Sequence, residues 1–231
     1  MPDELPRIAL YADLACPYAY IAAYRLRKLR DAYRGRVIVE HKCLSLEYVN
    51  RQPTPKPTLD SEIPILMLQQ PDLPWQPWHA PLWQWPVTIW PAFEAVKCAE
   101  RQSAERAGDL AWAIRTAFFV ESRCISMRDV LLELAAQVGL ELSRFTADFD
   151  SGQAKPQVIA EAREGWEQLK VAGSPTFVLP SGRQLSNLGL PEVEVDERQH
   201  ARVTGLRPAP CSGDDCLALY RQMIDEAAMG A

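Results

Sequence analysis

The chain has 231 residues, of which 48% are hydrophobic and 24% charged, and its formal net charge at pH 7 is −5. This composition provides enough apolar residues for one large globular domain or for one domain that carries an insertion. The acidic balance argues against nucleic acid as the main partner, and no run approaches the roughly 18 apolar residues of a membrane span.

The cellular compartment is predicted from the N-terminus and the cysteines. Residues 1–7 are acidic and contain two prolines, and the apolar run behind them is too short for a secretory signal. We therefore expect the protein in the cytoplasm, where thiols stay mostly reduced. In that compartment scattered cysteines are interpreted first as catalytic or metal-binding. The six cysteines are Cys16, Cys43, Cys98, Cys124, Cys211 and Cys216.

The first 44 residues predict two strands with a helix between them. Ile8–Leu14 is an apolar strand, residues 20–33 form a helix that Gly35 ends, and residues 36–44 form a second strand rich in β-branched residues. A strand, helix and strand of this length favour a parallel pair of strands.

Residues 52–91 follow, and they show no clear period. Proline is frequent here, and five tryptophans lie within sixteen residues, from Trp75 to Trp90. The segment predicts irregular structure that packs an inserted domain against the rest of the protein. An aromatic wall over the active site, with Trp85 and Trp90 as candidates, is the alternative, and the two are compatible.

The rest of the chain is predicted to be helical and then to return to strands. Helical segments lie at 92–107, 110–119, 130–138, 142–150 and 156–169. Residues 176–180 form a strand and 183–188 the second arm of a hairpin. A polar, irregular stretch then runs to Pro210, and residues 216–228 form a closing amphipathic helix.

Cys16 lies where the first strand gives way to the first helix. A helix start offers unpaired N–H groups and partial positive charge, so a thiol there is expected to have its pKa lowered from about 8.5 toward roughly 3.5–7.5. Pro17 suits the first helical position because its missing N–H has no partner to lose there. A dithiol site would have a second cysteine at position 19, where this chain has Ala19. A buried hydrophobic role is the alternative for a lone cysteine.

Three segments resemble the DsbA-like thioredoxin family. They are the Cys16-Pro17-Tyr18-Ala19-Tyr20 run, the helical stretch from Ala117 to Leu140, and the Gly173-Ser174-Pro175-Thr176-Phe177 loop. The resemblance implies an α/β thioredoxin fold with a helical domain inserted between its β-α-β and β-β-α halves. Residues 1–52 and 170–231 would form the thioredoxin-like domain, and residues 53–169 the insertion with its Pro/Trp-rich connection.

The resemblance also implies a binding loop opposite the cysteine. Pro175 would be cis, and the backbone of Ser174 would pair with an extended substrate like an added strand. Ser174 could also contact the Cys16 thiolate or a bound thiol. Pro17, Tyr18 and Thr176 complete the expected substrate- and thiol-binding residues.

The positions at which this chain departs from the family's motif bear on which of the family's activities it has. FrnE-like oxidoreductases have cysteine at both ends of the motif, whereas the 2-hydroxychromene-2-carboxylate isomerase and kappa glutathione transferase branch has serine where this chain has Cys16. The main hypothesis is a monothiol thiol–disulfide oxidoreductase that acts on a protein or small molecule bearing a thiol or disulfide. A glutathione-dependent isomerase or transferase is the first alternative, and a non-catalytic binding module is the second. No cofactor is required, although glutathione could take part.

Cys211 and Cys216 form a second notable pair. Their spacing permits a local disulfide if the two Cα atoms come within about 7 Å. A structural pair, a redox pair that senses oxidation or resolves a mixed disulfide on Cys16, and a metal site are all open interpretations. The three histidines have no metal-ligand spacing, so no metal is expected. The oligomeric state is left open, a homodimer included.

Overall fold

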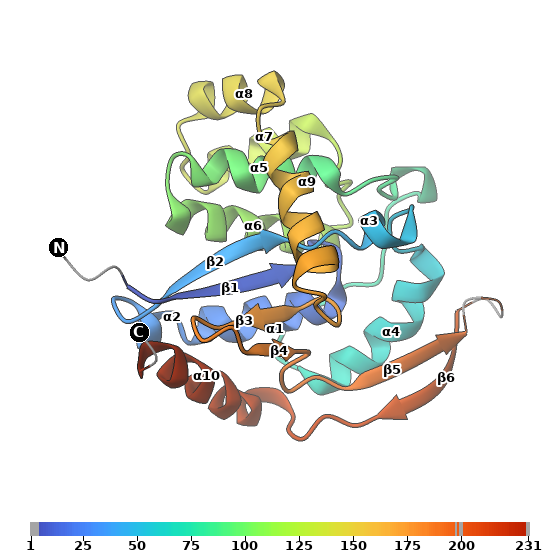
Figure 1. Cartoon of the computed structure of the whole chain (residues 1–231). Helices are drawn as coiled ribbons and strands as arrows, with labels where there is room; N and C mark the ends of the chain where they lie inside the picture. Colours follow the sequence, from blue (N-terminus) through green and yellow to red (C-terminus); the bar gives the residue numbers. More distant parts are fainter. Residues whose placement is uncertain (1–4, 197, 199–200, 230–231) are drawn as a thin grey trace.

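The computed structural model describes residues 5–196, 198 and 201–229, and a four-stranded mixed sheet lies at its centre (Figure 1). The strands lie in the order β2 (Ile38–Cys43), β1 (Arg7–Ala12), β3 (Thr176–Val178) and β4 (Gln184–Ser186). β1 and β2 are parallel, while β3 is antiparallel to both of its neighbours. Strands from the N-terminal and the C-terminal parts of the chain therefore lie in one sheet.

The N-terminal half follows the predicted strand–helix–strand pattern. β1 and β2 pair in parallel from Arg7 opposite Ile38 to Ala12 opposite Cys43. Between them lie α1 (Pro17–Lys28) and the short α2 (Arg30–Tyr33). The helix begins at Pro17, the first helical position expected for this proline, and thus three residues before the 20–33 range. It also breaks at Leu29, which starts the second short helix.

The expectation of irregular structure over residues 52–91 is wrong for its first part. After α3 (Leu46–Asn50) comes α4 (Lys56–Gln69), and only a 3₁₀ turn, η1 (Leu82–Gln84), interrupts the remainder before residue 90. Pro57 lies in the first turn of α4, where no donor is lost, but Pro64 lies inside the helix. Packing of Leu59 and Leu66 into the core stabilises α4 despite this proline.

Five helices continue the insertion. They are α5 (Trp90–Glu100), α6 (Ala104–Phe119), α7 (Arg128–Gln137), α8 (Leu142–Ser151) and α9 (Lys155–Arg163), which runs into the π-helical turn η2 (Glu164–Gln168). The break between α5 and α6 falls before the one expected, because the Ser103 side chain accepts a hydrogen bond from the Arg106 N–H and caps α6. No helix among the described residues is both long and apolar enough to cross a membrane.

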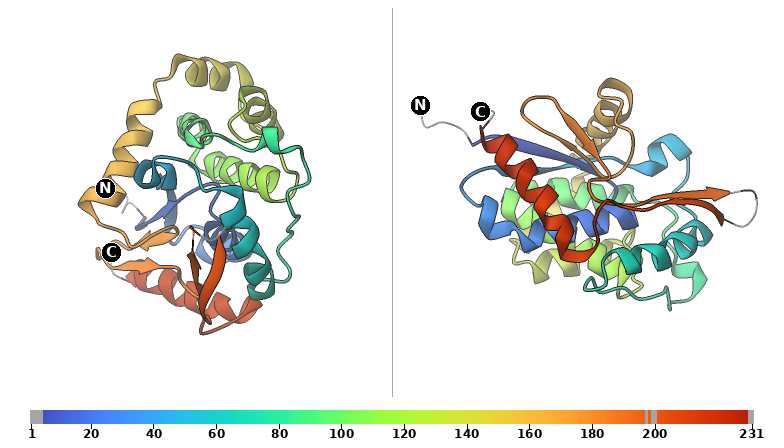
Figure 2. Two further views of the ribbon diagram at one scale, coloured as in Figure 1. Left: turned by 90° about the vertical axis from the view of Figure 1, so that its right-hand side faces the viewer. Right: turned by 90° about the horizontal axis from the view of Figure 1, so that it is seen from below.

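The C-terminal half contains an unexpected hairpin. β5 (Glu192–Asp196) and β6 (Arg202–Arg207) pair as a separate two-stranded sheet within the stretch predicted to be irregular. Figure 2 shows this hairpin extending beyond α10 (Leu217–Met229), with α4 beside it. Alternation of valine with acidic residues in Glu192-Val193-Glu194-Val195 was the available signal. A 3₁₀ turn, η4 (Gly213–Cys216), leads into α10.

α1 is shared by the two main hydrophobic cores. Tyr20 and Ile21 pack into the core that contains the insertion, whereas Ala22 and Leu26 pack into the core under α10. The Tyr20 ring is 5.0 Å from Trp75 and 4.8 Å from Phe119, measured between centroids. Aromatic contacts of this kind contribute about 0.5–1.5 kcal/mol beyond their buried area. The structure therefore confirms a thioredoxin fold in which α1 packs against a helical insertion.

Candidate functional site

Cys16 is the residue that precedes the first turn of α1, at the carboxyl end of β1. Its backbone is extended, with φ −82° and ψ 122°, and its carbonyl accepts the first helical hydrogen bond from the Tyr20 N–H at 3.1 Å. Pro17 follows at the start of the helix. The Cys16 side chain is a free thiol, and the residue is only 3% exposed.

The Ser174–Pro175 loop faces this thiol from the next strand of the sheet. β3 is antiparallel to β1, so the residues before β3 meet the residues after β1. The peptide bond between Ser174 and Pro175 is cis. The Cys16 Sγ donates to the Ser174 carbonyl at 3.3 Å, and the Ser174 Oγ accepts from the Asp13 N–H at 2.8 Å. Thr176, fully buried, donates to the Gly173 carbonyl and holds the loop from its other end.

Asp13 organises the turn that carries Cys16. One carboxylate oxygen accepts from the Ala15 N–H at 2.7 Å, and the other accepts from the Leu46 N–H at 2.8 Å. The buried Arg115 of α6 donates to the Asp13 carbonyl at 3.3 Å. Burial raises the pKa of Asp13 to about 6, while the two N–H groups oppose that rise. With both oxygens occupied, Asp13 acts as a cap on the turn.

The pKa of Cys16 contradicts the expected lowering. Burial is the largest cause and raises the pKa to about 12, and the charges of Asp13 and Glu62 act in the same direction. The Ser174 side chain and the Ala19 N–H favour the thiolate but do not outweigh the loss of water. In this conformation the helix start therefore holds a protonated thiol.

Tyr18 links the cysteine to the two segments next to α1. Its hydroxyl lies close enough to Glu62 of α4 and to the Val193 backbone of β5 for both to influence its pKa, which burial raises most strongly. The Glu62 charge also raises the pKa of Cys16. α4 in turn packs against β5 and β6. Tyr18 is thus the residue that links Cys16 to α4 and to the β5–β6 hairpin.

Cys211 and Cys216 are joined as a disulfide, with their Cα atoms 5.2 Å apart. The Cys216 Sγ lies 3.5 Å from the Gly189 carbonyl, which also accepts from the Arg25 guanidinium at 2.8 Å. Gln69 of α4 donates to the Cys211 carbonyl at 2.7 Å. The disulfide thus lies where the chain enters and leaves the β5–β6 hairpin. In this oxidised state neither sulfur is a thiol that could attack a mixed disulfide on Cys16.

Trp85 and Trp90, the suggested pocket wall, lie in different environments. Trp85 packs against Trp78 and Phe118 and lines a small apolar cavity of about 90 Å³, and Cys16 is not among the residues that line it. Trp90 contacts Tyr48 and Phe93. Within the described part of the chain, no group of three or more His, Cys, Asp or Glu side chains could hold a metal ion.

Sequence reasoning missed Glu62 and Arg115 as neighbours of the site. Glu62 lies in a segment interpreted as irregular, although Leu59, Ile63 and Leu66 follow the helical i, i+4, i+7 spacing. Arg115 lies between Ala111 and Phe118 on the buried face of α6. The same spacing could have shown that this arginine points inward, where a charge is rare without partners.

The fold and this turn define a thioredoxin-fold protein with one cysteine at the first strand-to-helix turn and a cis-proline loop opposite it. A family model, described as the DSBA-like thioredoxin domain, matches residues 7–196, and the chain belongs to that family. Members of this family are generally oxidoreductases or isomerases.

Several solved structures share the whole fold. A candidate protein disulfide isomerase from Nitrosomonas europaea is 20% identical, with a TM-score of 0.68 over 98% of this chain and 99% of that one. The cytosolic disulfide reductase DsbM from Pseudomonas aeruginosa, solved with GSH, is 19% identical, with a TM-score of 0.64 over 95% and 99%. A 2-hydroxychromene-2-carboxylate isomerase is 16% identical, with a TM-score of 0.54 over 78% and 87%.

Proposed function

We propose that this protein is a monothiol thiol–disulfide oxidoreductase in which Cys16 is the nucleophile. The observation that carries the proposal is the 3.3 Å contact between the Cys16 Sγ and the Ser174 carbonyl, directly before the cis peptide bond. A substrate strand that pairs with the backbone of this loop would bring its own sulfur to Cys16. Pro17, Tyr18, Ser174, Pro175 and Thr176 are the proposed binding residues.

The reaction proceeds through one mixed disulfide. The Cys16 thiolate attacks one sulfur of the substrate disulfide, so that a new S–S bond forms and the substrate S–S bond breaks. The leaving sulfur departs as a thiolate and takes a proton from water. Ala19 is fully buried in the position where a resolving cysteine would stand. A second thiol from outside the chain must therefore attack the mixed disulfide and release Cys16 reduced.

Glutathione is the resolving thiol that we propose. DsbM, which shares this fold over nearly its whole length, was solved with GSH. Cys211 and Cys216, the internal resolving pair suggested by the sequence, are bonded to each other. Glutathione attacks the substrate sulfur of the mixed disulfide, so that Cys16 leaves as a thiolate and a substrate–glutathione disulfide forms. A second glutathione attacks the glutathione sulfur of that product, so that the substrate leaves as a thiolate and glutathione disulfide forms. In total, two electrons from two glutathione molecules reduce one substrate disulfide.

The buried thiol requires that the site be opened before it reacts. With its pKa raised to about 12, only a small fraction of Cys16 is thiolate at neutral pH. A substrate that displaces Tyr18 would rehydrate the sulfur and let the helix start lower the pKa. Substrate binding and thiol activation are thus coupled in this proposal.

The test is glutathione-dependent reduction of a small mixed disulfide by wild type, Cys16→Ser and Cys124→Ser. Cys124 is the matched control because it is a free, partly exposed cysteine in the insertion. We expect Cys16→Ser to fall to the uncatalysed rate and Cys124→Ser to keep the wild-type rate. Peptide mass spectrometry after treatment with glutathione disulfide should then show an adduct on Cys16 in wild type and in Cys124→Ser. Equal rates in wild type and Cys16→Ser would overturn the proposal.

A glutathione-dependent isomerase or transferase is the second candidate. It is favoured by Ala19 together with the apolar cavity between Trp78, Trp85 and Phe118, which could hold an aromatic substrate. In that case glutathione binds without forming a bond to Cys16, and its own thiol does the chemistry. Calorimetric binding of glutathione to Cys16→Ser would favour this candidate, whereas binding that needs the Cys16 thiol favours the oxidoreductase.

A further inference from the structure

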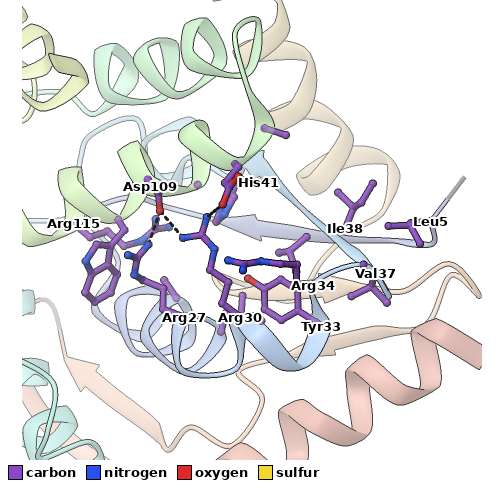
Figure 3. A pocket seen from close by; sticks show the side chains of 18 residues that line it. Leu5, Arg27, Arg30, Tyr33, Arg34, Val37, Ile38, His41, Asp109 and Arg115 are labelled. Atoms are coloured by element: carbon purple, nitrogen blue, oxygen red, sulfur yellow. Dashed lines mark hydrogen bonds and ion pairs between the residues drawn. The ribbon is translucent and has the colours of Figure 1, made fainter. Parts of the chain in front are cut away.

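A cavity of about 360 Å³ opens on the side of α1 away from the cysteine end of the helix. It lies between the last turns of α1, α2, the start of β2 and the N-terminal half of α6 (Figure 3). None of the residues proposed to bind substrate at Cys16 lines it. Its volume falls in the range of about 300–1,000 Å³ that is usual for small-molecule sites.

One end of the cavity is strongly polar. Arg30 of α2 donates to Asp109 at 2.9 Å and to Glu105 at 2.7 Å, and Arg27 of α1 donates to the same Asp109 oxygen at 3.0 Å. The Arg27 guanidinium also lies 5.2 Å from the Trp112 ring, which fixes its position. Figure 3 shows these groups converging on Asp109. Both arginines therefore present positioned guanidinium groups to the cavity.

Arg115 adds a buried guanidinium to this polar end. Its residue is 1% exposed, and its Nε has no hydrogen-bond partner. His41 lies nearby and stays neutral, since burial and the charges of Arg115 and Lys97 lower its pKa to about 3. The lining contains four arginines and two carboxylates, and Asp31 and Asp13 lie outside it beside Arg34 and Arg115. Because carboxylates already balance part of the arginine charge, the cavity favours a ligand with one negative charge over a ligand with several.

The other end of the cavity is apolar. Leu5, Val37 and Ile38 lie together there, away from Asp109 and Arg115 (Figure 3). Leu26 and Val39, which belong to the core under α10, also line it. The cavity therefore separates charge from apolar surface along its length, as a ligand with one anionic end and one hydrocarbon end requires.

We propose that this cavity is a binding site for a small amphipathic carboxylate. Arg30 and Arg27 receive the carboxylate, which guanidinium groups bind with paired, charge-assisted hydrogen bonds. The hydrocarbon part lies along the start of β2 toward Leu5. Because Arg115 also donates to the Asp13 carbonyl in the Cys16 turn, the site adjoins the active-site turn without being part of it.

Octanoate and 1-octanol are the probes for this site, because they share a chain and differ in charge. Binding to the full chain is measured by isothermal titration calorimetry. We expect octanoate to bind and 1-octanol to bind at least about tenfold more weakly, because a hydrogen bond to a charged group typically contributes about that factor. Equal binding of the two, or no binding of octanoate, would overturn the proposal.

Two variants locate the bound molecule. Arg30→Gln should weaken octanoate binding about tenfold, whereas Arg36→Gln, which breaks an exposed pair with Asp225 outside the cavity, should leave it unchanged. Ala104→Trp fills the cavity from an exposed helix position and should abolish binding while the protein stays folded by circular dichroism. Octanoate binding that survives both Arg30→Gln and Ala104→Trp but fails in Trp85→Leu would place it in the apolar cavity under α4 and overturn the proposal.

Discussion

Two cysteines in this protein occupy the same kind of place and differ in their chemistry. Cys16 precedes α1 and Cys216 precedes α10, and both are almost fully buried. Each sulfur lies near a backbone carbonyl from another part of the chain, Ser174 for Cys16 at 3.3 Å and Gly189 for Cys216 at 3.5 Å. Local sequence position does not distinguish them.

What distinguishes them is the surface that each one faces. Cys216 meets Cys211 and bonds to it, beside Gly189, whose φ of +66° favours glycine and whose added Cβ would lie 3.1 Å from the Cys211 sulfur. Cys16 meets a cis-proline loop that contains no second thiol. The first arrangement ties the chain together, and the second leaves one sulfur beside a backbone edge that a substrate could pair with. A helix start therefore becomes a reactive site only through what the fold sets opposite it.

The largest effect on this contrast is expected from Asp13→Asn. Burial raises the pKa of Asp13 from 3.8 to about 6, so the folded protein holds this proton more tightly than the unfolded chain does. Stability contributed by this group is therefore present at pH 4 and is lost as pH rises through about 6. The free energy of unfolding of wild type minus that of Asp13→Asn should be about 2.4 kcal/mol larger at pH 4 than at pH 7.

Urea unfolding at several pH values measures this difference. Asp215→Asn is the control, because Asp215 is exposed in the turn that carries Cys216 and its carboxylate remains in water. We expect the pH-dependent difference to be larger for Asp13→Asn than for Asp215→Asn. A flat difference for Asp13→Asn would mean that its two N–H donors fully offset the effect of burial on its pKa.

Removing the disulfide should have the next largest effect. Cys211→Ala combined with Cys216→Ala opens a short loop, and the loss of chain restriction should lower the free energy of unfolding by about 2 kcal/mol. Formation of the glutathione adduct on Cys16 should continue at a rate within twofold of wild type. Release of that adduct should also be unchanged. If release of glutathione from Cys16 stops in the double variant, Cys211 and Cys216 take part in resolving the mixed disulfide. The disulfide would then be part of the chemistry of Cys16.

The smallest effect is expected from Glu62→Gln. The Glu62 charge raises the pKa of Cys16, so its removal should lower that pKa and raise the iodoacetamide alkylation rate at pH 7.5 about threefold. Asp60→Asn on the same helix is the control, since Asp60 is paired with Lys56 at the surface. Alkylation is followed by peptide mass to separate Cys16 from Cys124. An unchanged rate in Glu62→Gln would show that burial and the Asp13 charge keep the thiol protonated without a contribution from Glu62.

The sequence alone predicted the elements with strong local signals. The two parallel strands, the helix after Pro17 and the hairpin at Thr176 lie where their residue patterns placed them, within a few residues. α4 was missed because its two prolines hide the helical spacing of Leu59, Ile63 and Leu66. The β5–β6 hairpin was missed because its strands are polar and only half-buried. Both missed elements are stabilised mainly by tertiary contacts, which local sequence patterns do not show.

The sequence by itself determined the family, the fold and the position of Cys16, because motif order and local periodicity depend on residues close together in the chain. Only the tertiary structure decided the state of that cysteine. Desolvation of the Cys16 thiol depends on the tertiary packing that excludes water from it, and the charges that raise its pKa include Glu62, 46 residues away in the chain. The same packing brings Arg115 to the Asp13 turn and to the neighbouring cavity. A short motif cannot report burial, because burial is set by the segments that fold over it.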